Sequence, residues 1–270
     1  MQAGFQLRSL WVAWWYRALF ARLSGQRDTI RANLARAFAD KGAGERRRLE
    51  RRVLRNQARF YGEILNFEHF LPLVSAPEIE GAGREAFFEA VAAKRPVILV
   101  TGHVGNYVAG LAMLSRLGIE AGFLYRTRGT ALLDSRFDDI IAQSGQRGFK
   151  ISHRKFEGYE PNLRAFIAYL RAGRPVVMLA DHRDRKGERL RFLGHRAPTS
   201  LTPAQLALKF DAALIPCFVL RDGRGSRFRV RMETPIAPAS PKAMMRAFND
   251  HLSALIREEP AQWCWTIRRW

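Results

Sequence analysis

A chain of 270 residues in which 47% are hydrophobic can bury a substantial core. Its two cysteines, Cys217 and Cys264, are too few for a disulfide framework, so a reducing compartment is the default expectation. The formal net charge of +20 indicates a polyanionic partner; this is expected to be an anionic lipid surface or an acidic carrier protein rather than nucleic acid, because no helix-turn-helix, zinc-finger or ribonucleoprotein motif is visible.

The first helical stretch, residues 10–23, is rich in tryptophan but interrupted by arginine. It is too short and too charged to span a bilayer, which needs about 20 apolar residues, and no signal-peptide cleavage site follows it. Trp11, Trp14 and Trp15 between basic residues favour an amphipathic helix at the headgroup level of a membrane. The alternative is an ordinary amphipathic helix packed on the domain.

Two further helices are predicted at residues 28–38 and 44–67. The second begins with a run of arginines, which by itself indicates only a solvated helix face. We therefore expect an N-terminal helical, membrane-associating region over residues 1–70 and an α/β domain over residues 71–270, together in one structural unit.

Strands and helices alternate from residue 97 onward. Apolar runs predict strands at 97–100, 122–125, 149–152, 176–179, 213–220 and 227–232, and helical patterns lie at 107–117, 132–144, 162–172, 202–210 and 241–259. Thr202 is expected to cap the helix at 202–210, with Pro203 in its first turn. The alternation predicts an α/β fold with a mostly parallel central sheet flanked by helices, preceded by the N-terminal amphipathic extension.

A single histidine, His103, stands where the first of these strands passes into a helix. This places it at the carboxyl edge of the sheet, where open α/β folds bind their ligands. A side chain with an ordinary pKa of about 6.5 suits proton transfer near neutral pH. The alternative is a histidine that caps the helix or simply lies at the surface.

The segment G-H-V-G-N-Y around His103 resembles the G-H-F-G-N-W block of the bacterial lipid A biosynthesis acyltransferases, the lauroyl/myristoyl transferase family. Five more blocks resemble this family, in the same order, from residue 31 to the C-terminus. Their residues are Arg31, Asn33, Leu34, Ala37 and Phe38; Tyr125, Arg126, Leu133 and Asp134; Leu179, Ala180, Asp181 and His182; Phe192, Leu193, Gly194, Ala197, Pro198 and Thr199; and Pro260, Gln262, Trp263, Trp265, Arg268 and Arg269.

The resemblance implies an enzyme that transfers an acyl chain from acyl carrier protein, or from acyl-CoA, to a hydroxyl of a lipid A precursor or a related glycolipid. It implies a peripheral location at the cytoplasmic face of a bacterial inner membrane. His103 would be the general base. No cofactor is expected beyond the donor's own pantetheine arm, and no metal-ligand spacing, P-loop or dinucleotide motif is present.

The chain departs from the family pattern at three positions. Val108 stands where the family has the acid of its His-x4-Asp/Glu motif, Ile267 stands where histidine is usual, and the arginine expected after Asp134 has no match nearer than Arg147. A histidine without its acid is expected to be poorly oriented. The alternative function is therefore a catalytically degenerate relative that binds lipid or carrier protein.

Asp181 follows the strand at 176–179 and reaches the same sheet edge as His103, so it is expected either to supply the missing carboxylate or to bind the acceptor, unless it only caps a turn. The backbone N–H groups near Gly105 and Asn106 are expected to face the oxyanion of the reaction. Substrate binding is further expected at Arg126, which could hold a lipid phosphate or form a salt bridge, and at Arg183, Thr199 and Arg268. Arg183 belongs to a basic loop, 183–191, that with residues 147–155 could form a positive rim.

Overall fold

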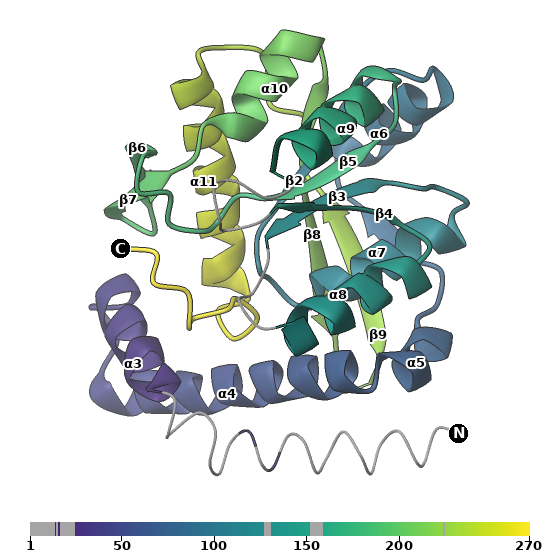
Figure 1. Ribbon diagram of the computed structural model, residues 1–270. Helices are drawn as coiled ribbons and strands as arrows, with labels where there is room; N and C mark the ends of the chain where they lie inside the picture. Colours follow the sequence, from purple (N-terminus) through teal and green to yellow (C-terminus); the bar gives the residue numbers. More distant parts are fainter. Residues whose placement is uncertain (1–13, 15, 17–24, 127–130, 152–158, 224) are drawn as a thin grey trace.

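Figure 1 shows the computed structural model of the chain, which describes residues 14, 16, 25–126, 131–151, 159–223 and 225–270. Its centre is a seven-stranded sheet in the order β1-β9-β8-β2-β5-β3-β4. Neighbouring strands pair in parallel except that β9 runs antiparallel to β8 and carries β1 parallel to itself. The strands are β1 (Glu78–Glu80), β2 (Val97–Thr101), β3 (Gly122–Arg126), β4 (Arg147–Ile151), β5 (Val176–Leu179), β8 (Ala213–Asp222) and β9 (Arg227–Met232). The predicted α/β fold with a mostly parallel sheet is confirmed.

Helices cover both faces of this sheet, and the order of the strands decides which helix lies on which face (Figure 1). The chain moves outward from β2 to β3 and β4, but it moves in the opposite direction from β4 to β5 and from β5 to β8. Because parallel crossovers are right-handed, the helices of the two sets lie on opposite faces. One apolar core holds side chains of α5 (Phe67–Phe70), α6 (Gly83–Ala92), α7 (Tyr107–Arg116) and α8 (Ala131–Gln143), with η2 (Leu71–Leu73) beside it; the other holds side chains of α9 (Tyr159–Arg171), α10 (Thr202–Phe210) and α11 (Pro241–Glu258).

Two helices before the sheet lie along its carboxyl edge. These are α3 (Gln26–Ala37) and α4 (Ala43–Leu65), whose boundaries fall within two residues of the predicted ones (Figure 1). Leu49, Val53 and Leu54 of α4 are buried in the same core as Trp263 and Trp265 near the C-terminus. The helices preceding residue 70 therefore share a core with the sheet, and the predicted division at residue 70 stays a prediction.

The tryptophan-rich stretch at residues 10–23 lies outside the described residues except for two positions. Trp14 is 64% exposed, whereas Tyr16 is buried and its hydroxyl lies 2.7 Å from Oε1 of Gln26. Across the part of the chain that the structure describes, no helix combines the length and the apolar character needed to cross a bilayer.

Part of the predicted basic loop is a β-hairpin instead. Strands β6 (Glu188–Phe192) and β7 (His195–Thr199) pair antiparallel around a two-residue turn, Leu193–Gly194, whose φ angles are both positive, as a tight hairpin turn requires. The hairpin is held on α11, where the Leu193 N–H donates to Ser253 Oγ at 2.9 Å. The predicted cap on α10 was also wrong, because Leu201 is its N-cap residue and no side chain caps the helix.

Candidate active site

His103 and Asp181 meet because their strands are neighbours. Thr101 at the end of β2 is paired with Leu179 at the end of β5, so the residues two positions further along the chain come side by side. The His103 Nδ1 atom lies 2.7 Å from Asp181 Oδ1, and the backbone N–H of His103 donates to Asp181 Oδ2 at 2.8 Å. The Asp181 side chain is completely buried, but the His103 side chain is 13% exposed and thus accessible to a reactant.

A third donor reaches the same carboxylate from the C-terminal segment. The indole Nε1 of Trp263 donates to Asp181 Oδ2 at 2.9 Å. Burial disfavours the charged form of Asp181 and would raise its pKa, but the charge and hydrogen bonds of His103 outweigh burial and hold this pKa below its ordinary range. An ionised carboxylate only accepts hydrogen bonds, so in the neutral form of the His103 ring the one proton sits on Nδ1 and Nε2 keeps its lone pair.

The expectation that the N–H groups of Gly105 and Asn106 face an oxyanion was wrong. The Gly105 N–H donates to the Gln262 carbonyl at 2.8 Å, and the Asn106 N–H donates to the Val219 carbonyl at 3.2 Å. The loop after β2 packs this closely because Gly105 has no side chain: at its φ of +57° a Cβ atom would lie 2.0 Å from the Val219 oxygen. Both N–H groups therefore already donate to acceptors within the protein.

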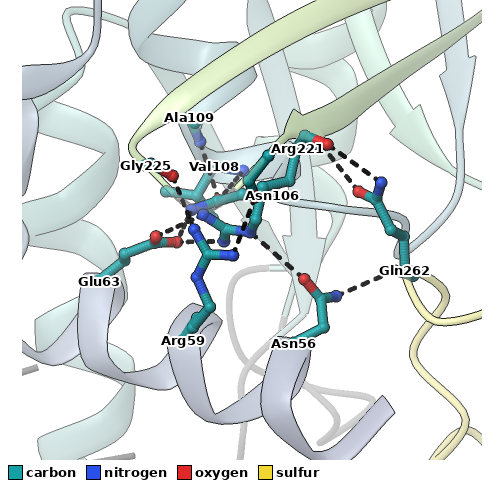
Figure 2. Close-up of polar contacts among 10 residues, drawn as sticks. Asn56, Arg59, Glu63, Asn106, Val108, Ala109, Arg221, Gly225 and Gln262 are labelled. Carbon is teal, nitrogen blue, oxygen red and sulfur yellow. Dashed lines mark hydrogen bonds and ion pairs between the residues drawn. The ribbon is translucent and has the colours of Figure 1, made fainter. Parts of the chain in front are cut away.

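The Asn106 side chain has a structural task as well. Its Oδ1 accepts the N–H groups of Val108 and Ala109 at 3.1 and 3.0 Å and so caps α7, which begins at the next residue. Its Nδ2 donates to Glu63 Oε2 at 2.8 Å (Figure 2). Asn106 is fully buried, which makes it a support of the His103 loop.

Behind Asn106 lies a buried ion pair that sequence analysis did not find. Arg221 at the end of β8 donates through both terminal nitrogens to Glu63 of α4, at 2.7 and 2.6 Å, and both side chains are nearly inaccessible (Figure 2). Breaking such a pair from one side typically costs about 3–5 kcal/mol. A single glutamate and a single arginine in a charged chain carry no sequence signal for this pairing.

Val108 does not leave His103 without a carboxylate. Its side chain is fully buried in the apolar core under α7, where a carboxylate would be surrounded by hydrocarbon. Asp181, from a different strand, provides the contact to the histidine ring that the missing motif acid was expected to make. The expected poor orientation of His103 was therefore wrong.

The four other residues expected to bind substrate differ in their exposure. Arg126 is the last residue of β3, and its side chain lies outside the described part of the chain. Arg183 and Arg268 are exposed. Thr199 is fully buried, and its hydroxyl accepts hydrogen bonds from Asn249 at 3.1 Å and from Arg269 at 2.7 Å. Roles in substrate binding for these four residues stay predictions.

Arg269, next to the predicted Arg268, secures the loop that carries Asp181. It is fully buried and donates to the carbonyls of His182, at 3.1 Å, and of Pro198. Burial lowers its pKa to about 10. The guanidinium thus ties the C-terminal segment to both the Asp181 loop and the hairpin.

The first and last blocks of the family resemblance contact each other. Asn33 of α3 donates to the carbonyls of Trp265 and Ile267 at 2.8 and 2.9 Å, and the Phe38 and Trp265 rings lie 5.6 Å apart. The C-terminal segment, fixed in this way, presents Trp263 to Asp181.

A narrow apolar cavity of about 30 Å³ lies between α7 and the sheet. Thr101 and Tyr107 are among its lining residues, and the centroids of the Tyr107 and His103 rings lie 5.1 Å apart. Its other walls are apolar side chains of α7 and of five strands, including Leu111, Met113 and Met232. One residue of the cavity lining, Tyr107, therefore packs against the candidate base.

The description "bacterial lipid A biosynthesis acyltransferase" belongs to the family whose sequence pattern matches residues 6–270. The chain belongs to this family. It is 25% identical over 256 residues to the phosphatidylinositol mannoside acyltransferase of Mycolicibacterium smegmatis, covering 94% of this chain and 82% of that protein. It is 27% identical over 256 residues to the protein of the same name from Mycobacterium tuberculosis, covering 93% and 79%. The resemblance inferred from the motifs is thus confirmed, and the chain is an acyltransferase-family protein of lipid metabolism.

The low pKa of Asp181 predicts how stability depends on pH. A carboxyl whose pKa is lowered in the folded state stabilises the fold above its unfolded pKa of about 3.9, and this contribution is lost as the pH falls further. The free energy of unfolding of the wild type should therefore decrease below about pH 4, and Asp181→Asn should remove part of that slope. Chemical denaturation over a pH series measures both, and Asp250→Asn, at an exposed position of α11, is the control that should keep the wild-type slope. Identical slopes for the wild type and Asp181→Asn would contradict the low pKa.

Proposed function

We propose that the protein transfers an acyl chain from acyl carrier protein, or from acyl-CoA, to a hydroxyl of a lipid A precursor or a related glycolipid, with His103 as the general base. The single observation that carries this proposal is the contact between His103 Nδ1 and the buried Asp181 carboxylate at 2.7 Å. A carboxylate that fixes a histidine in this way holds the tautomer that a base needs and stabilises the imidazolium that forms.

The proposed chemistry proceeds in two steps. Nε2 of His103 accepts the proton of the acceptor hydroxyl while that oxygen attacks the thioester carbonyl, which gives a tetrahedral oxyanion. The oxyanion then collapses, the carbon–sulfur bond breaks, and the thiolate leaves with the proton returned by Nε2. The products are an acyl ester of the lipid and a free thiol, and Asp181 stays ionised throughout.

The apolar cavity under α7 supports an acyl substrate. Its lining offers no charged side chain, and it includes Tyr107, whose ring packs against His103. At about 30 Å³ it is closed down to the space of one or two water molecules, so an acyl chain must displace side chains to enter. The methionines in its wall, Met113 and Met232, are the flexible side chains that permit this.

The acceptor is proposed to be a glycosylated, phosphate-bearing lipid. The named relatives act on phosphatidylinositol mannoside, and the family description names lipid A biosynthesis. Both acceptors combine sugar hydroxyls with phosphate. The net charge of +20 suits an anionic substrate of this kind.

Removing the base should strongly slow transfer. His103→Ala should lower the rate of acyl-lipid formation by about 10²–10⁴-fold, the usual contribution of a positioned general base. Asp181→Asn should also lower it, whereas His195→Ala, an exposed histidine of the hairpin, should retain wild-type activity. Mass spectrometry of lipid extracts from cells that express each variant measures the product.

Two results would contradict this function. Full activity of folded His103→Ala would show that another group is the base. A wild-type protein that forms no acylated lipid from either donor, yet binds lipid or carrier protein, would leave the degenerate binding protein as its function.

The location is proposed to be peripheral, at the cytoplasmic face of a bacterial inner membrane. Trp14 is 64% exposed in a basic stretch, as expected for a side chain that enters the headgroup region. Trp14→Gln should weaken sedimentation of the protein with vesicles of phosphatidylcholine and phosphatidylglycerol by at least about threefold, and added salt should weaken it further. Because Trp14 is exposed, the fold should tolerate this change. A deletion that also removed the buried Tyr16 would disturb the core. Unchanged sedimentation of Trp14→Gln would exclude this residue as an anchor.

A further inference from the structure

A second cavity, of about 290 Å³, opens between α4 and the end of the β8–β9 pair. Its residues are separate from His103 and Asp181. Arginines dominate the lining and outnumber the carboxylates five to two: they are Arg52, Arg55, Arg59, Arg221 and Arg229, against Asp222 and Glu259. Figure 2 shows Arg59 and Arg221 pointing toward each other from α4 and from the end of β8.

Helical spacing gathers the arginines of α4 at this cavity. Arg52, Arg55 and Arg59 are three and four residues apart, so they lie on one face of the helix. Arg52 and Arg55 are exposed, as are Arg47 and Arg51 of the same run, but Arg47 and Arg51 do not line the cavity. The basic run of α4 is therefore more than a solvated face.

Arg221 is neutralised by Glu63, but the positive charges of the other cavity arginines are incompletely neutralised. Within the described parts of the chain, Arg52 and Arg55 form no ion pair, and Arg229 approaches Glu80 and Glu259 only at 3.5 and 3.7 Å. Arg59 donates to two backbone carbonyls, of Gly223 and Gly225, at 3.2 and 2.7 Å. Burial and, to a lesser extent, the neighbouring charge of Arg221 lower the pKa of Arg59 to about 10, although the charge of Glu63 acts in the opposite direction. An anion in the cavity would relieve this repulsion.

Size and donor type identify the chemistry of the ligand. Guanidinium groups bind phosphate through paired N–H donors. A cluster of arginines therefore recognises phosphate by the geometry of its oxygens as well as by its charge. The volume of about 290 Å³ lies at the lower end of small-molecule sites, so it suits a headgroup or a nucleotide fragment. We propose that this cavity is a phosphate-binding site. The phosphate is part of a lipid headgroup, part of a nucleotide-bearing donor, or free in solution.

The site lies directly behind the His103 loop. Gln262 lines the cavity, its side chain accepts the Arg221 N–H at 2.8 Å, and its carbonyl accepts the Gly105 N–H at 2.8 Å. Arg221 also reaches Asn106 through Glu63. A phosphate bound here contacts Gln262, which is hydrogen-bonded to Gly105 in the His103 loop. It does not occupy the position of the reacting groups.

The test is calorimetric titration of the full chain at constant ionic strength. The probes are inorganic phosphate, glycerophosphoinositol as a soluble lipid headgroup, and adenosine 3′,5′-bisphosphate as the nucleotide part of a donor. The double variant Arg52→Gln/Arg55→Gln should weaken the tightest of these by at least about tenfold, because both charges line the cavity. The control Arg47→Gln/Arg51→Gln removes the same charge from positions of the same helix that are likewise exposed but do not line the cavity, and it should bind within about twofold of the wild type.

The results distinguish the three sources of phosphate from one another. They also distinguish a failure of this proposal from a failure of the proposed acyl transfer. Pocket-dependent binding of any probe supports the site, and the probe that binds most tightly identifies the source. Equal weakening by both double variants, an unaffected pocket variant, or no saturable binding of any probe would overturn it. His103→Ala should bind like the wild type, so loss of acyl transfer and loss of phosphate binding are measured independently.

Discussion

One buried carboxylate organises the carboxyl edge of this sheet. Asp181 has no contact with water and accepts three N–H groups, two from His103 and one from Trp263. These bonds join the ends of two neighbouring strands to the C-terminal segment. An ion buried in this way is stable only while its donors stay in place, so the tertiary structure and the orientation of the histidine ring depend on the same contacts.

The rest of the structure holds these donors. Arg269 binds the loop that carries Asp181, and Asn33 of α3 fixes the segment that carries Trp263. On the other side, the Glu63–Arg221 pair holds Asn106, which caps α7 directly after the His103 loop. The helices before the sheet therefore support the candidate active site, in addition to any contact with a membrane.

The sequence predicts those elements whose residues form a recognisable local pattern. Buried parallel strands appear as short apolar runs, and His103 and Asp181 were found because each follows such a run. The hairpin β6–β7 was not predicted, because its alternating arginines resemble a solvated loop and its stability comes from α11. Glu63 and Arg221 are 158 residues apart, and Trp263 is 82 residues from Asp181. Such long-range pairs are set by tertiary packing, which leaves no local pattern.

The tautomer of His103 shows whether Asp181 holds the ring in the form that a general base needs. An ionised Asp181 beside Nδ1 requires the proton of the neutral ring to sit on Nδ1, which leaves Nε2 as the basic atom. Nitrogen-15 chemical shifts of the imidazole, measured above the pH at which the ring is protonated, distinguish the two neutral forms. Our expectation is a protonated Nδ1 and an unprotonated Nε2. A ring protonated at Nε2 would contradict it, because Nδ1 would then face the carboxylate without a proton and Nε2 could accept none from a substrate.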